Sequence, residues 1–78
     1  MKNGLLKIGQ VAKLTGVLSS TINFYTNVGL LAAAERSQGG YRLYKRTAVP
    51  RVKLIQRLQE MRRLTLQEIR QTLRRRRG

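Results

Sequence analysis

Short hydrogen-bonding side chains without charge gather on one side of the segment 19–28. At 100° per residue, two hydroxyl residues at the start of the segment, two asparagines and one threonine fall within about 120° of one another. They are Ser19, Ser20, Asn23, Thr26 and Asn27. A merely solvated helix face is more usually rich in Lys, Glu and Arg. Small amides and hydroxyls suit close approach to the edges of nucleic-acid bases, and the pattern favours that chemistry.

A strong positive charge accompanies this face. The 78 residues contain 17 Lys and Arg against three acidic residues, which gives a net charge of +14. Such a charge repels itself inside a small folded chain, so a polyanionic partner is expected. Arg36 and Arg42 flank a Gly-Gly turn, where a solvated hairpin with two incidental cations is the alternative. The run Arg74-Arg75-Arg76-Arg77 is either a frayed, solvated tail or an extension that grips phosphate.

The residue types that are missing exclude most other chemistry. The sequence has no His, Cys or Asp, so it offers no imidazole, no thiolate and no cluster with metal-ligand spacing. Its three Glu are scattered, and no Gly-rich phosphate loop precedes a helix. We therefore expect no enzymatic activity, no cofactor and no metal. No apolar run is long enough to span a bilayer and no signal peptide is indicated, so we expect a cytoplasmic protein without a membrane partner.

Helix-start, helix-stop and turn signals divide the chain into short elements. Gly16 and Gly29 stand where two helices would end, and Gly39-Gly40 supplies a positive-φ hairpin turn. A third helix begins at Thr47 as N-cap, with Pro50 in its first turn. The expected elements are a helix over 9–15, a helix over 19–28, a hairpin over 35–44, a helix over 47–63 and a helix that begins at 65.

Two of these helices carry further signals. In the last helix, Thr65 and Glu68 form a capping box, with Leu64 and Ile69 as a hydrophobic staple. The third helix has an apolar stripe wide enough to pack on two sides, which makes it the expected spine of the core. The stripe consists of Ala48, Val52, Leu54, Ile55, Leu58 and Met61.

The order and spacing of these motifs resemble the DNA-binding domain of the MerR family of bacterial regulators. The similar runs are 6–12, 15–17, 20–22, 24–25, 29–31, 40–44 and 66–69, and the resemblance covers about residues 5–73. The resemblance implies a mainly α winged helix-turn-helix with a small β-hairpin, about four helices plus the wing, in which the third and fourth helices form a second, helical wing. It divides the chain into a domain over 1–73 and an Arg-rich tail over 74–78.

The resemblance also implies where double-stranded DNA would be contacted. Residues on or beside the major-groove helix would meet bases, and wing residues would meet the backbone or minor groove. Arg62 and Arg63 would meet phosphate from the end of the third helix, again as the resemblance implies. With the basic residues Arg36 and Lys45 added, the candidate DNA-binding residues are Ser19, Ser20, Asn23, Tyr25, Arg36, Tyr41, Arg42, Lys45, Arg62 and Arg63. Tyr25 also lies on the apolar side of its helix, so its hydroxyl alone would reach phosphate.

Several departures from the family pattern matter. Asn23 stands where members usually have Arg, which leaves the base preference open, and Leu18 replaces a Ser cap, which leaves capping to Ser19 or Ser20. The sequence stops before the long dimerising helix and the effector-binding region of family members. It is therefore either a truncated domain or a free-standing module, with no small-molecule effector of its own. We expect a monomer in solution, with any pairing imposed by adjacent half-sites on DNA.

Three functions compete at this point. The leading one is a sequence-specific regulator of transcription of the MerR type without its own sensor domain. The second is a DNA architectural factor, such as an excisionase-like recombination accessory protein, because such proteins are also small, basic winged helices without effectors. The third is a basic module for RNA or anionic membrane, which the hairpin and the scarcity of exposed aromatic residues disfavour.

Overall fold

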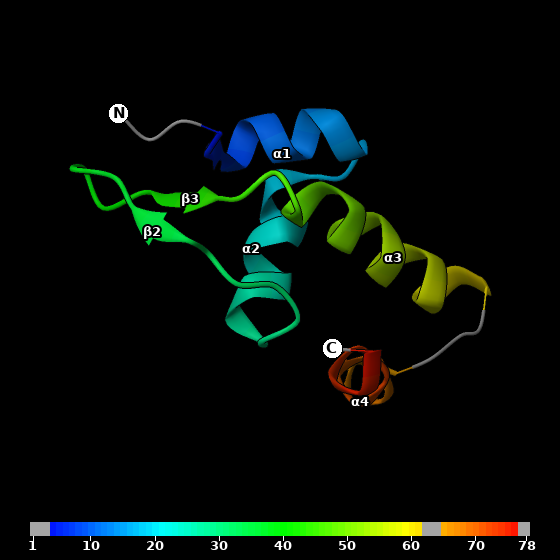
Figure 1. The fold of residues 1–78 in the computed structure, drawn as a ribbon. Helices are drawn as coiled ribbons and strands as arrows, with labels where there is room; N and C mark the ends of the chain where they lie inside the picture. Colours follow the sequence, from blue (N-terminus) through cyan, green and yellow to red (C-terminus); the bar gives the residue numbers. More distant parts are fainter. Residues whose placement is uncertain (1–3, 62–64, 77–78) are drawn as a thin grey trace.

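Four helices and a small antiparallel sheet make up the part of the chain that the structure, a computed structural model, describes, residues 4–61 and 65–76 (Figure 1). The predicted mainly α winged helix-turn-helix is confirmed. In chain order the elements are β1 (Leu6–Lys7), α1 (Ile8–Thr15), α2 (Ser19–Asn27), β2 (Glu35–Arg36), β3 (Arg42–Tyr44), α3 (Ala48–Met61) and α4 (Leu66–Arg76).

The turn between α1 and α2 is built on a left-handed glycine. Gly16 has φ 74°, and its N–H donates to the carbonyl of Ala12 at 2.8 Å, as the sequence predicts. The start of α2 differs from the expectation. Leu18 itself occupies the N-cap position and makes no side-chain cap, and Ser19 is already helical. The prediction that Ser19 or Ser20 caps this helix was therefore wrong, because both come too late in the chain to occupy the cap.

The sheet has three strands, one more than the two strands of the predicted hairpin. Its order is β1-β3-β2, with Leu6 opposite Tyr44 on one side of β3 and Arg36 opposite Arg42 on the other. The positive φ of the hairpin turn falls on Gly40, at 85°. Figure 1 shows the β2–β3 hairpin projecting from one side of the helices as a wing.

The two C-terminal helices begin as their sequence signals predict. Pro50 lies in the first turn of α3, where it removes no helical hydrogen bond. At α4 the backbone N–H of Thr65 donates to Oε1 of Glu68 at 2.8 Å, and the N–H of Glu68 donates to Oγ1 of Thr65 at 3.2 Å. The capping box is thus confirmed, while Leu64 lies outside the described residues. Because α4 continues to Arg76, the run 74–76 extends a helix instead of beginning a separate tail.

One core holds these elements together and fixes α2 against the sheet. It takes apolar side chains from all four helices, from β1 and β3, from the turn between α1 and α2 and from the loop after α2: Leu6, Val11, Val17, Ile22, Tyr25, Leu30, Leu31, Tyr44, Ala48, Val52, Ile55, Leu58, Ile69 and Leu73. The predicted stripe of α3 is buried at four positions and half-buried at Leu54. In the described parts of the chain, none of the helices has the length and apolar character needed to cross a bilayer.

Candidate nucleic-acid interface

The exposed face of α2 carries hydroxyl and amide groups. Ser19, Ser20, Asn23 and Asn27 are exposed, while Ile22 on the opposite side is fully buried. The apolar side is less completely packed than predicted, because Phe24 is 44% exposed. The helix therefore offers donors and acceptors without charge along one side, at the spacing of successive turns.

Thr26 is the member of this predicted face that turns inward. Its hydroxyl donates to the carbonyl of Ile22 at 2.8 Å and lies 2.9 Å from the hydroxyl of the buried Tyr44. Since the single hydroxyl proton of Thr26 is used toward Ile22, Tyr44 is the donor between the two hydroxyls. Thr26 thus attaches α2 to β3 and helps to fix the helix beside the wing.

The start of α2 adds backbone donors to the two serines. The first N–H groups of an α-helix have no partner one full turn earlier, and Leu18 supplies no side-chain acceptor for them. The N–H of Thr21 donates to the carbonyl of Leu18 at 3.0 Å, which leaves the N–H groups of Ser19 and Ser20. Together with the hydroxyls of Ser19 and Ser20, these groups can donate hydrogen bonds to an anion such as phosphate.

Internal hydrogen bonds brace the hairpin turn that carries Arg36 and Tyr41. Nη1 of Arg36 donates to the carbonyl of Gly40 at 2.8 Å, across the turn. The N–H of Tyr41 donates to Oγ of Ser37 at 3.1 Å, and the ring of Tyr41 is 75% exposed. The wing therefore presents a cation and an aromatic ring from a braced turn.

Arg42 joins the wing to α2. Its Nη1 donates to Oδ1 of Asn23 at 2.9 Å and its Nη2 donates to Oδ1 of Asn27 at 2.7 Å. A hollow of about 250 Å³ lies at this junction and brings four of the predicted residues together. Its lining consists of Ile8, Asn23, Arg36, Gly40, Tyr41 and Arg42.

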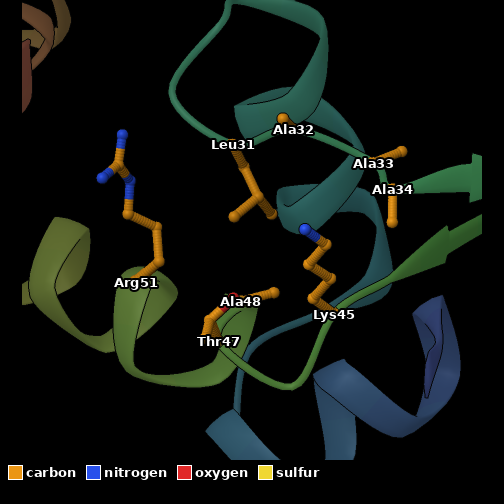
Figure 2. A pocket seen from close by; sticks show the side chains of 8 residues that line it. All are labelled: Leu31, Ala32, Ala33, Ala34, Lys45, Thr47, Ala48 and Arg51. Atoms are coloured by element: carbon orange, nitrogen blue, oxygen red, sulfur yellow. The ribbon is translucent and has the colours of Figure 1, made fainter. Parts of the chain in front are cut away.

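Lys45, which directly follows β3, lines a different hollow. This one measures about 490 Å³ and is lined by Leu31, Ala32, Ala33, Ala34, Lys45, Thr47, Ala48 and Arg51. Figure 2 shows the side chains of Lys45 and Arg51 extending on either side of Leu31. Lys45 is exposed and can meet an anion, but it is not among the residues at the junction of wing and α2.

Tyr25 lies in the core and not on the exposed face. It is 2% exposed, and its hydroxyl donates to Oε1 of Gln59 in α3 at 2.9 Å. Burial raises the pKa of this phenol above its ordinary value, and the negative charge of Glu60 adds to the effect. The expectation that the Tyr25 hydroxyl reaches phosphate is therefore replaced by a positioning role, in which it ties α2 to α3.

The remaining residues divide into those that lie outside the described chain and those that sequence reasoning missed. Arg62 and Arg63 lie outside the described residues. Asn27 was missed as a site residue, although the 100° spacing already placed it on the polar face.

A third hollow, of about 160 Å³, brings arginines from α3 and α4 together beside the loop after α2. It is lined by Gly29, Leu30, Arg51, Arg70, Leu73 and Arg74.

No signal in the sequence could have assembled this arginine hollow. Nε of Arg51 donates to the carbonyl of Leu30 at 3.2 Å. The Arg70 guanidinium lies 3.5 Å from the point where a Cβ on Gly29 would be. Both contacts depend on how α3 and α4 fold back onto the loop, which spacing along the chain does not encode.

Comparison with known proteins identifies a protein family over nearly the whole chain. The family described as "MerR HTH family regulatory protein" matches residues 6–76. The nodulation protein NolA of Bradyrhizobium sp. (strain NC92) is 45% identical over 67 residues, which is 86% of this chain and 28% of NolA.

Two solved structures have similar folds. The transcription regulator PbrR691 from Ralstonia metallidurans CH34, solved in complex with lead(II), matches with a TM-score of 0.80 and 38% identity, over 91% of this chain and 55% of that one. HiNmlR, a MerR-family regulator lacking the sensor domain and bound to promoter DNA, matches with a TM-score of 0.77 and 24% identity, over 87% and 51% of the two chains. The chain thus spans about half or less of the length of these proteins.

Proposed function

The chain belongs to the MerR family of helix-turn-helix regulatory proteins, as a DNA-binding domain of its transcriptional regulators, and we propose that it binds promoter DNA through α2 and the β2–β3 wing. In this proposal α2 enters the major groove. The exposed side chains of Ser20 and Asn23 meet base edges there, and Ser19 with the first turn of α2 meets a phosphate.

The wing supplies the contacts that position the protein on the duplex. Arg36, Tyr41 and Arg42 meet the DNA backbone beside the groove that α2 occupies. Lys45 adds a phosphate contact beyond β3, and Arg62 and Arg63 add contacts from the second wing, as the resemblance implies. Tyr25 supports the surface from within by its bond to Gln59.

One observation carries this proposal. Asn23 of the uncharged α2 face lines a single hollow together with Arg36 and Arg42 of the wing, so a base-reading group and phosphate-contacting groups lie side by side. HiNmlR, which is bound to promoter DNA while lacking its sensor domain, supports the same use of the fold.

The proposal is tested by fluorescence anisotropy with a labelled duplex and charge-matched variants. We expect Arg36→Ala to weaken binding by roughly 5- to 10-fold, as the loss of one wing contact to the backbone. Lys53→Ala is the control, because Lys53 is exposed on α3 and lines none of the surfaces described above; it should change affinity by less than about 3-fold. Equal losses in the two variants would mean that binding depends on net charge alone, and the proposed surface would be wrong.

A further inference from the structure

The hydrogen bonds of Arg42 do more than connect two elements. Its two terminal nitrogens donate hydrogen bonds to the side-chain oxygens of Asn23 and Asn27, at 2.9 and 2.7 Å. These asparagines are four residues apart and therefore lie on the same side of α2 in successive turns. Each terminal nitrogen of the planar guanidinium donates to one of the two oxygens, a rigid arrangement that the flexible ammonium of a lysine does not provide.

These two hydrogen bonds determine which end of each side-chain amide faces Arg42. In both asparagines Oδ1 is turned to the guanidinium, so each Nδ2 amino group is directed away from it. Both side chains are exposed, and the amino groups are donors only. Arg42 itself has five N–H donors and no acceptor, of which these two bonds use two. The linked group Asn23–Arg42–Asn27 is therefore rich in donors and poor in acceptors.

The major-groove edges of the bases differ in the same property. Guanine offers two acceptors, N7 and O6, whereas adenine pairs its acceptor N7 with the donor N6 amino group. An asparagine reads adenine with its oxygen and its nitrogen together, and here the oxygen already accepts from Arg42. A donor-rich group matches guanine better than adenine.

We infer that Arg42 is a specificity-determining residue, which orients Asn23 and Asn27 as donors and thereby selects guanine at the base step that they meet. The inference rests on the proposed binding of DNA by α2 and the wing. It differs from the expectation that Arg42 contacts only phosphate, because such a contact carries no sequence information.

Arg36 is a matched control within the same hairpin. It lines the same hollow as Arg42, but its side chain bonds to the carbonyl of Gly40 in its own turn and not to α2. Arg36→Ala removes one cation from the wing without changing the orientation of the asparagines. Arg42→Lys keeps the charge and removes the fork, so it separates orientation from electrostatics.

The experiment selects bound sequences from a random duplex library with the wild-type chain. It then measures the ratio of affinities for the selected and a scrambled duplex. For Arg42→Lys we expect this ratio to fall roughly 10-fold while affinity for the scrambled duplex stays within about 3-fold of wild type. For Arg36→Ala the ratio should stay within about 2-fold, since both affinities fall together. Thermal unfolding of each variant checks that the fold is retained.

Modified bases test the guanine assignment directly. Replacing the selected guanine by 7-deazaguanine removes N7, and we expect wild-type affinity to fall roughly 10-fold and that of Arg42→Lys by less than about 3-fold. A selected site with no required guanine, or an Arg42→Lys variant that keeps the wild-type ratio, would overturn the inference and leave the proposed function standing. Failure of the wild type to enrich any sequence would instead overturn the proposed function, and this inference with it.

Discussion

At the scale of single residues, the hydroxyl of Tyr25 links the stability of the fold to pH. Burial and the nearby Glu60 raise its pKa in the folded state, so the neutral phenol is favoured there and ionisation favours the unfolded chain. The contribution is fully present below about pH 10, the ordinary tyrosine pKa, and is lost as the pH rises through the folded value. We expect the free energy of unfolding to decline more steeply above about pH 10 in the wild type than in Tyr25→Phe.

Urea denaturation at several pH values measures this difference. At pH 7 Tyr25→Phe should lower the free energy of unfolding by about 1 kcal/mol, because the bond to Gln59 is lost. Tyr41→Phe is the matched control, since that ring is 75% exposed, and it should follow the wild type at every pH. Parallel declines in wild type and Tyr25→Phe would show that the Tyr25 hydroxyl has no part in the pH dependence.

Single residues also show what a sequence can and cannot indicate about the site. Helical spacing correctly placed Asn23 and Asn27 on an exposed face, because a face follows from periodicity alone. The same spacing already put Tyr25 on the apolar side, and it lies in the core. The hydrogen bonds from Arg42 to the two asparagines were not predictable, because they depend on the angle at which the hairpin meets α2.

At the scale of elements, two glycines with equal space around them have opposite roles. Gly9 lies within α1, and Gly16 follows that helix with φ 74°; a Cβ added at either would meet no atom within 4 Å. Gly9→Ala should raise the free energy of unfolding by about 0.5–1 kcal/mol, through helix propensity and the unfolded state. Gly16→Ala should lower it by about 1 kcal/mol, because the left-handed conformation is strained for alanine.

Chemical denaturation of the two variants shows whether backbone conformation or side-chain packing determines the change in the free energy of unfolding. Since neither methyl group would meet a neighbour, a difference in sign can come only from the backbone. Changes of the same sign in both variants would contradict the assignment of Gly16 as the left-handed residue that ends α1.

Elements differ in how strongly local sequence determines them. The capping box of α4 and the glycine stops of α1 and α2 were predictable, because each depends on residues a few positions apart. Strand β1 was missed because two residues are too few to show an alternating pattern, and it is defined only by its pairing with β3. Local signals thus indicated the helices and the hairpin, while the third strand required the assembled fold.

At the scale of the whole molecule, the charge of +14 opposes association between copies of the chain. Among the described residues the core covers most large apolar side chains, which leaves Leu14, Leu18, Phe24 and Tyr41 exposed. We therefore expect the 78-residue chain to be monomeric at micromolar concentration in the absence of DNA. Sedimentation equilibrium in moderate salt measures this, and a stable dimer would direct attention to Leu14 and Leu18 as an interface.

The same charge provides the most direct test of DNA binding by this surface, which is the salt dependence of affinity for duplex DNA. Each phosphate that Lys and Arg neutralise releases condensed counterions, so log affinity falls linearly with log salt. If the surface of α2, the wing and the flanking basic residues neutralises about 5–8 phosphates, the slope should lie between about −4.5 and −7. Anisotropy titrations from low to moderate salt measure this slope, and a value shallower than about −2 would contradict binding through this basic surface.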